Sequence, residues 1–206
     1  MTRSVPAAAS VRETAAEDFR ERERTMKFLI ASDVHGSAYY CRRLIEAFER
    51  ERADRLLLLG DILYHGPRND LPEEYDPKKV IEMLNKISRG IFSVRGNCEA
   101  EVDQMVLKFP VMAEYALLSV GERLVFLTHG HVFNNDDLPP LHDGDILLCG
   151  HTHVPACEER DGYVYMNPGS VSIPKDGTDH SYMTLENGVF TWKTLDGAAF
   201  MTFSAL

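Results

Sequence analysis

Residues 27–36, with the sequence KFLIASDVHG, join a short apolar run to a polar cluster, and this junction guides the interpretation of the whole chain. The run from Phe28 to Ala31 is typical of a strand that is covered on both faces. Asp33 and His35 follow where that strand would end. Burying an unpaired polar group costs roughly 1 to 7 kcal/mol. We therefore expect these side chains to have a partner, and a bound metal ion is the obvious one.

The chain continues from this junction as strand, helix, strand, helix and strand. Apolar residues recur at helical spacing over residues 41–48, and residues 56–59 repeat the strand pattern. Asp76 is placed to cap a second helix that has Pro77 at its first position. Residues 91–94 form the third expected strand. This βαβαβ order predicts a parallel sheet with right-handed crossovers.

The pattern becomes mainly β after about Val111. Strand-like segments occupy residues 114–120, 124–127, 146–148, 163–166, 181–185 and 189–194. Turn residues separate several of them, and Asn187-Gly188 is a strong hairpin signal. The short connections favour antiparallel pairing. We expect one domain over residues 26–206, made of two packed sheets.

Residues 1–25 differ from the rest of the chain. Their acidic and basic residues balance, and they lack the apolar core of a signal peptide. We expect a solvated N-terminal extension. Because Met26 immediately precedes the first strand, a start annotated too far upstream is an alternative explanation of this segment.

Composition excludes several classes of protein. With 206 residues, of which 44% are hydrophobic, the chain is long enough for a substantial core, and no apolar stretch is long enough to cross a bilayer. The net charge of −10 argues against a nucleic-acid groove, so an anionic substrate would need local positive charge. Four cysteines without a CxxC pair indicate reduced thiols and a cytoplasmic protein.

Polar clusters follow five of the expected strands. Each offers only oxygen or imidazole nitrogen donors: Asp33 with His35, Asp61, Asn97, His129, and His151 with His153. Residues i and i+2 of an extended segment point the same way, so each of the two pairs is expected to aim both donors at one spot. Glycines flank every cluster and allow close backbone approach. Open α/β sheets place their sites at such strand ends.

In their order, these clusters resemble the motifs of a known enzyme family. The relevant stretches are Asp33-Val34-His35, Gly60-Asp61, Gly96-Asn97, Thr128-His129-Gly130-His131 and Gly150-His151-Thr152-His153. Together they resemble the calcineurin-like metallophosphoesterases. Residues 60–69, 95–105 and 167–175 are similar to the YfcE-type branch of bacterial phosphodiesterases. The resemblance covers the chain from about Met26 and implies a four-layer α/β/β/α sandwich of two mixed sheets flanked by helices.

The resemblance also implies a centre with two divalent metal ions. One ion would take Asp33, His35 and His153, the other Asn97, His129 and His151, and Asp61 would bridge them. This donor set suits Mn²⁺, Zn²⁺, Fe²⁺ or Ni²⁺, and Mn²⁺ is the ion that the resemblance favours. The implied reaction is hydrolysis of a small phosphodiester by a hydroxide that bridges the two ions.

One departure from the wider family concerns proton transfer. Cys98 follows Asn97 where most members have a histidine. A thiol with a pKa near 8.5 is a weak proton donor, so we expect poor turnover of alkyl monoesters. His65 and His131 are candidates for proton transfer, and Arg68 and Cys98 for substrate contact. A structural role for each of these four residues stays open.

Two other functions remain as alternatives. One is a phosphomonoesterase or nucleotidase, and the other is a non-catalytic scaffold that resembles a retromer subunit of the same fold. The full donor set, including His35, favours the enzyme. Exposed strand edges make a homo-oligomer compatible with the sequence, while neither a membrane nor a nucleic acid is an expected partner.

Overall fold

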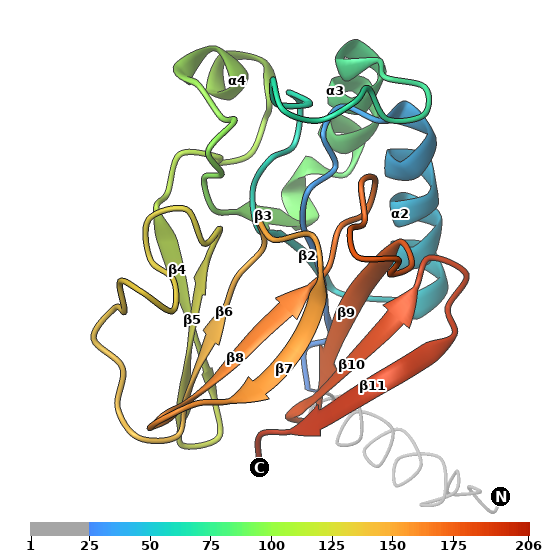
Figure 1. Cartoon of the computed structure of the whole chain (residues 1–206). Helices are drawn as coiled ribbons and strands as arrows, with labels where there is room; N and C mark the ends of the chain where they lie inside the picture. Colours follow the sequence, from blue (N-terminus) through green and yellow to red (C-terminus); the bar gives the residue numbers. More distant parts are fainter. Residues whose placement is uncertain (1–24) are drawn as a thin grey trace, which may run out of the picture.

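The computed structural model describes residues 25–206, so the expected N-terminal extension lies almost entirely outside the described residues. Its elements occur in the following order: β1 (Phe28–Ala31), α2 (Ala38–Glu51), β2 (Arg55–Leu58), α3 (Pro77–Lys86), a 3-10 turn η1 (Ser88–Gly90), β3 (Ile91–Ser93), α4 (Glu101–Val106), β4 (Tyr115–Val120), β5 (Arg123–Thr128), β6 (Asp145–Leu148), β7 (Pro155–Glu159), β8 (Tyr163–Pro168), β9 (Ser181–Glu186), β10 (Val189–Thr194) and β11 (Ala199–Ser204). Figure 1 shows their arrangement.

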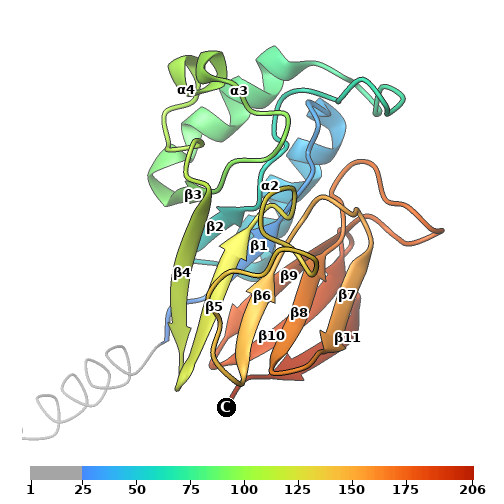
Figure 2. The ribbon, with the colours of Figure 1, turned by 60° about the vertical axis from the view of Figure 1, so that its left-hand side comes forward.

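Two mixed sheets pack face to face, as predicted (Figure 2). The first sheet has the order β11-β10-β9-β1-β2-β3, and the second has the order β4-β5-β6-β8-β7. In the first sheet, β1, β2 and β3 run parallel, as the βαβαβ order predicts, while β9 pairs antiparallel with β1. The expected hairpin at Asn187-Gly188 joins β9 to β10.

The antiparallel pairing predicted for the second half is wrong for three strands. In the second sheet β5, β6 and β8 run parallel, with β4 and β7 paired antiparallel at its two edges, whereas β9, β10 and β11 of the first sheet pair antiparallel as expected. The long connection 129–144 returns the chain to the start of β6, and β7 lies between β6 and β8 in sequence. Because these connections bring the chain back to the same end of the sheet, the strands that they join run parallel, where short hairpins were expected.

The core lies on both faces of the first sheet because side chains alternate along each strand. In β1, Leu29 packs with the buried faces of α2 and α3, whereas Ile30 belongs to the core between the two sheets. The second sheet contributes residues such as Ile146 and Leu148 to that inner core. Trp192 lies fully buried there and donates its indole N–H to the carbonyl of Asn167 at 2.7 Å.

The outer face of the second sheet is covered by the connection 129–144, and no helix lies there among the described residues. Phe133 and Leu141 of this connection pack against Phe126 and Leu147 of the sheet. The Tyr163 hydroxyl donates to Asn135 at 3.0 Å and ties the same layer down. The sandwich of two mixed sheets is confirmed, with a loop in place of helices as its fourth layer.

The topology gathers the expected site at one edge. β1, β2 and β3 are parallel neighbours, so their carboxyl ends lie together, and the carboxyl ends of β5 and β6 lie together in the facing sheet (Figure 2). Every cluster singled out in the sequence follows one of these five strands. No described helix is both long and apolar enough to span a membrane.

Candidate metal centre

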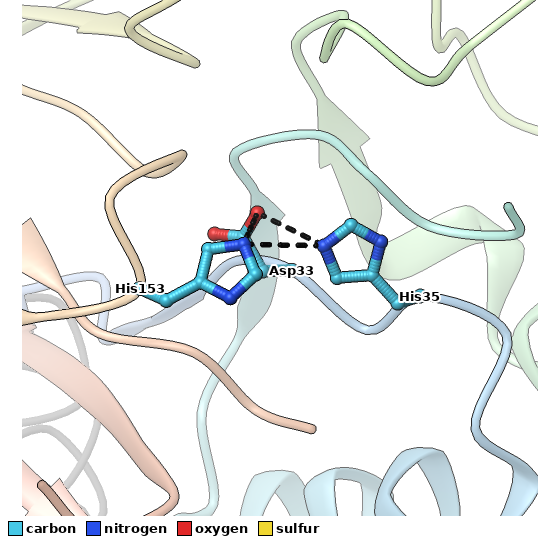
Figure 3. A group of neighbouring side chains, drawn as sticks. All are labelled: Asp33, His35 and His153. Carbon is cyan, nitrogen blue, oxygen red and sulfur yellow. Dashed lines mark hydrogen bonds and ion pairs between the residues drawn. The ribbon is translucent and has the colours of Figure 1, made fainter. Parts of the chain in front are cut away.

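The first group of site residues consists of Asp33, His35 and His153 (Figure 3). The Nε2 atoms of His35 and His153 lie 3.3 Å apart, and Asp33 Oδ1 lies 3.5 Å from the first and 3.2 Å from the second. All three side chains are buried, with Asp33 fully so. Asp33 Oδ1 has no hydrogen-bond donor. A buried carboxylate oxygen without a donor leaves a negative charge that a cation would satisfy.

The second group consists of Asn97, His129 and His151. His129 Nε2 lies 3.2 Å from Asn97 Oδ1 and 3.2 Å from His151 Nδ1. Asp61 lies between the two groups, because its Oδ2 atom is 3.7 Å from His35 Nε2 and 3.5 Å from His129 Nε2. The seven donors therefore form two clusters joined by one carboxylate, which is the arrangement that the resemblance implied.

Backbone carbonyls orient three of the imidazoles. The Nδ1 atoms of His35, His129 and His153 contact the carbonyl oxygens of Tyr64, Leu59 and Ile173 at 2.8, 2.6 and 2.6 Å. A carbonyl oxygen only accepts, so each Nδ1 donates, and the Nε2 of a neutral ring then presents a lone pair to the centre. This is the tautomer that a metal ligand requires.

The two aspartates divide their oxygens in the same way. Asp33 Oδ2 accepts the N–H of His151 at 3.1 Å, and Asp61 Oδ1 accepts the N–H of Cys98 at 2.9 Å. The second oxygen of each carboxylate stays directed at the imidazoles. Each hydrogen bond thus fixes one carboxylate with its remaining lone pairs aimed at the centre.

Five of the seven donors have left-handed backbone. Asp33, His35, Asp61, His151 and His153 have φ values between 48° and 69°. Such conformations cost about 1 to 3 kcal/mol per non-glycine residue and occur mainly at functional sites. The expected cause of convergence, an extended backbone with i and i+2 on one side, is therefore wrong. Left-handed turns aim the side chains, and His151 and His153 lie in different clusters.

Close backbone approach is needed at Gly60 and Gly96. A Cβ atom on Gly96 would lie 2.1 Å from Asp61 Oδ1, and one on Gly60 would lie 2.5 Å from the Gly96 nitrogen and 3.0 Å from His129 Nδ1. Neither position has room for a side chain, because real Cβ contacts are not that short. The expectation that these glycines permit crowding is supported at both positions.

The electrostatics of the centre favour positive charge. Burial raises the pKa of Asp33, but the attraction of its carboxylate to the adjacent His153 and His35 imidazoles, when these are protonated, outweighs it and holds the pKa well below its usual range. Burial lowers the pKa of His129, but the Asp61 and Asp33 carboxylates outweigh it and raise the pKa to about 9. Without bound cations, protons are thus drawn to the centre, and divalent ions would satisfy the same potential.

Sequence reasoning missed Glu99, a buried carboxylate beside the centre. Glu99 accepts the N–H groups of Asp61 and Ile62 at 2.9 and 2.7 Å and that of Gly96 at 2.5 Å. Burial raises its pKa, and the charge of Asp61 adds to the shift. Glu99 joins the loops after β2 and β3 and so positions Asp61 and Asn97.

Two serines that sequence reasoning also missed support Asp33. The hydroxyls of Ser170 and Ser172 donate to the Asp33 carbonyl oxygen at 3.0 and 2.9 Å. The Asn167 side chain accepts the N–H of Gly169 at 2.8 Å and closes a tight turn next to Ser170. Serines two residues apart next to a turn carry no distinctive signal of their own.

The remaining candidates surround the centre. His131 stacks edge-on against His129 with ring centroids 5.4 Å apart, and its Nδ1 atom is buried without a partner. His65 packs edge-on against Tyr64 and Tyr75, and its Nδ1 atom is likewise unpartnered. Cys98 lies close enough to His35 and Asp61 for the three to form a further donor group. Burial, with the charge of Asp61, raises the pKa of the Cys98 thiol.

A cavity of about 480 Å³ opens over the centre. Asp61, Asn97, His151 and His153 contribute to its wall, as do Arg68, Cys98 and Lys175. Arg68 therefore faces the same space as the donors. Neither His65 nor His131 lines this cavity, although both contact residues that do.

Comparison with known proteins agrees with this geometry. The family model described as the calcineurin-like phosphoesterase superfamily domain matches residues 26–188. The chain therefore belongs to this superfamily of metallophosphoesterases. It is 48% identical over 166 residues to phosphodiesterase YfcE of Escherichia coli K12, covering 81% of this chain and 90% of that protein.

Structural comparison gives the same result. A solved structure of the E. coli phosphoesterase YfcE superimposes with a TM-score of 0.84 at 45% identity, covering 88% of this chain and all of the other. A probable metallophosphoesterase of Bacillus subtilis, YsnB, is 25% identical over 84% of this chain and 92% of its own length. Zinc-bound Vps29 of Entamoeba histolytica shares the fold, with a TM-score of 0.56, 21% identity and coverage of 88% of this chain and all of that one.

Proposed function

We propose that this protein is a metal-dependent phosphodiesterase. The observation that carries the proposal is the convergence of seven side chains of types that can ligate a metal on two adjoining clusters that share the Asp61 carboxylate. The name of the 48% identical relative, phosphodiesterase YfcE, supports the same reaction class.

The donors fit two divalent cations. Asp33, His35 and His153 would hold one, Asn97, His129 and His151 the other, and Asp61 would contact both. When bound, the cations would supply Lewis acidity that polarises the phosphoryl group and lowers the pKa of water toward neutrality. Oxygen and imidazole ligands suit Mn²⁺, our first choice, and also Zn²⁺, Fe²⁺ and Ni²⁺.

The other side chains of the site bind and orient the substrate. Arg68 offers a planar fork of N–H donors that matches phosphate oxygens, and it lines the cavity over the donors. His131 has an unpartnered Nδ1 atom next to His129, so we assign it to hydrogen bonding with the substrate or to proton transfer. Neither ring lines the cavity, and His65 is the weaker candidate because its ring packs edge-on against two tyrosines, whereas the ring of His131 packs against the donor His129.

Cys98 determines which esters react readily. It supplies no positive charge and no strong acid beside the Asp61 carboxylate. An alkoxide leaving group needs a proton, whereas a nitrophenolate does not. We therefore propose that diesters with good leaving groups react readily and simple alkyl phosphates slowly.

The chain is further proposed to act as a cytoplasmic homo-oligomer with one domain over residues 26–206. All four cysteines are free thiols, which suits a reducing compartment. β4 is an edge strand with Tyr115 and Leu117 about half exposed, and such apolar edges favour self-association. Light scattering of the purified protein tests this part of the proposal.

The decisive experiment removes metal from the purified protein with a chelator and then restores it. We expect hydrolysis of bis(4-nitrophenyl) phosphate to be lost and then recovered with Mn²⁺, and 4-nitrophenyl phosphate to react more slowly. If the monoester were hydrolysed faster than the diester, the result would favour a phosphatase or nucleotidase. If the protein bound Mn²⁺ but hydrolysed neither ester at any pH, the result would favour the scaffold function.

A further inference from the structure

Arg68 and Lys175 are the basic residues that line the cavity over the metal centre. They come from connections that lie far apart in the sequence, one between β2 and α3 and the other between β8 and β9. Both residues are exposed, and neither forms an ion pair with an acid among residues 25–206. Asp61, a member of the metal centre, is the one acidic residue in the cavity wall.

The backbone holds both basic residues in relation to the centre. Arg68 occupies the third position of a tight turn with Pro67 at the second, closed by the Asn69 N–H donating to the Gly66 carbonyl at 3.3 Å. The Asn69 side chain also donates to the His65 carbonyl at 2.8 Å. This turn packs next to Cys98, because a Cβ on Gly66 would lie 3.5 Å from its sulfur.

Hydrogen bonds to both its N–H and its carbonyl hold the backbone of Lys175 in place. Its N–H donates to the carbonyl of His153 at 3.3 Å, so it is joined directly to a residue of the centre. Its own carbonyl accepts the N–H of Thr178 at 3.0 Å and the Thr178 hydroxyl at 2.7 Å. Two positive charges are thus placed beside the centre on constrained backbone, which lowers the entropy lost when a ligand binds.

These charges exceed what a simple diester needs. A phosphodiester group carries one negative charge, and two divalent cations held by Asp33 and Asp61 would already neutralise it. The cavity, at about 480 Å³, is within the range of pockets that hold whole small molecules. Two further unpaired cations in its wall therefore complement a second anionic group on the same substrate.

On the basis of the proposed function, we propose that Arg68 and Lys175 form a second anion subsite, and that the preferred substrates are phosphodiesters carrying an additional phosphate on one ester arm. The guanidinium of Arg68 binds two oxygens of that phosphate, and the ammonium of Lys175 binds as a point charge. The scissile group lies over the donors, and the second phosphate lies between the two basic side chains.

A matched pair of substrates tests the proposal. Thymidine 5′-(4-nitrophenyl phosphate) and its 3′-phosphorylated derivative have the same scissile bond and leaving group, and they differ only in the added phosphate. With Mn²⁺ present, the wild-type protein should favour the 3′-phosphorylated compound by about tenfold in kcat/KM, mainly through KM, since charge-assisted hydrogen bonds have about this strength.

Charge-neutral variants assign that preference to the two residues. R68Q and K175Q should each reduce the ratio of the two kcat/KM values by about threefold or more, and the double variant should bring it close to one. Lys108 and Arg89 are exposed basic residues outside this cavity, so K108Q and R89Q are matched controls that should keep the ratio. An equal kcat/KM for both compounds in the wild type, or an unchanged ratio in the double variant, would overturn the subsite.

Equilibrium binding separates this proposal from the proposed activity. Calorimetry compares thymidine 3′,5′-bisphosphate with thymidine 5′-phosphate on the Mn²⁺-loaded protein. Tighter binding of the bisphosphate that depends on Arg68 and Lys175 supports the subsite even if no diester is hydrolysed. Hydrolysis of diesters without any preference for the bisphosphate overturns the subsite while the phosphodiesterase assignment stands.

Discussion

The Nε2 atoms of His35 and His153 face each other at 3.3 Å, while the Nδ1 atom of each ring donates to a backbone carbonyl. Neutral rings in these tautomers direct two lone pairs at one another, and lone pairs at that distance repel unless positive charge lies between them. Asp33 Oδ1, without a donor, lies beside both. A cation bound between the two rings would remove this repulsion, and the first prediction concerns the number of cations that bind.

Replacing His153 with alanine should remove one of two bound ions. The change deletes the Nε2 atom that lies 3.2 Å from Asp33 Oδ1 and leaves the cluster around His129 intact. Elemental analysis after gel filtration should give about two manganese ions per wild-type chain and about one per variant chain. H142A is the control, because His142 is exposed and remote from the donors. Equal manganese contents in wild type and H153A would contradict the assignment of His153.

Gly96 should tolerate no side chain. In G96A the new Cβ would lie 2.1 Å from Asp61 Oδ1 and 2.5 Å from the Asp61 nitrogen, so the carboxylate between the two clusters must move. We expect Mn²⁺ affinity measured by calorimetry to fall by about 10- to 100-fold. The control is G90A, where the backbone is not left-handed and a Cβ would approach no neighbour closer than 4.0 Å. If G96A bound Mn²⁺ with the affinity of the wild type, Mn²⁺ binding would not depend on the present position of the Asp61 carboxylate.

Glu99 should act as a positioning residue for Asp61. In E99Q one acceptor oxygen is replaced by an NH2 group, which cannot accept from the N–H groups that Glu99 now satisfies. Leaving a buried donor unsatisfied costs about 1 to 3 kcal/mol. Urea unfolding of the metal-free protein should show that loss, and calorimetry should show weaker Mn²⁺ binding as well. The matched control is E101Q, at an exposed position of α4. A stability loss with unchanged Mn²⁺ affinity would limit Glu99 to a structural role.

Glu51 should make stability depend on pH in acid. Burial raises its pKa, but hydrogen bonds from Lys193, Tyr182 and Lys27 outweigh it and lower the pKa to about 2 from 4.5. The folded state therefore binds fewer protons, so this stabilisation is complete above about pH 4.5 and disappears as the pH falls toward about 2.

The comparison of wild type with E51Q tests that dependence. Partial solvent screening reduces the expected difference in the free energy of unfolding to about 1 to 2 kcal/mol at pH 7. Urea unfolding at several pH values should show this difference narrowing below pH 4.5. E46Q serves as control, because Glu46 is exposed on the same helix. If the difference in the free energy of unfolding between wild type and E51Q stayed constant down to about pH 3.5, the predicted role of Glu51 in the pH dependence would be refuted.

Much of the arrangement could be predicted because local chemistry and topology agree. The apolar run before Asp33 indicated a buried strand, and the N-cap at Asp76 with Pro77 marked where α3 begins. Parallel strands then bring their carboxyl ends to one edge, which brings residues distant in sequence into one site. β7 escaped prediction because it is an edge strand that starts with Pro155 and ends with Glu159, and neither residue favours strands.

The details of the centre depend on tertiary contacts that no sequence pattern encodes. The ring orientations of His35 and His153 depend on hydrogen bonds to the carbonyl oxygens of Tyr64 and Ile173, which lie in other segments. In the sequence, Glu99 is indistinguishable from other acidic residues in polar loops. Its role comes from the N–H groups of Asp61 and Gly96, which donate to it only in the folded structure. Pairing directions in the second sheet likewise depend on how the connection 129–144 returns.

The central claim is that the two clusters sharing Asp61 hold two cations. Anomalous diffraction from a crystal grown with Mn²⁺ tests it most directly. We expect two manganese peaks, one among Asp33, His35 and His153 and the other among Asn97, His129 and His151, with Asp61 contacting both. A single peak, no peak, or peaks elsewhere on the molecule would contradict it.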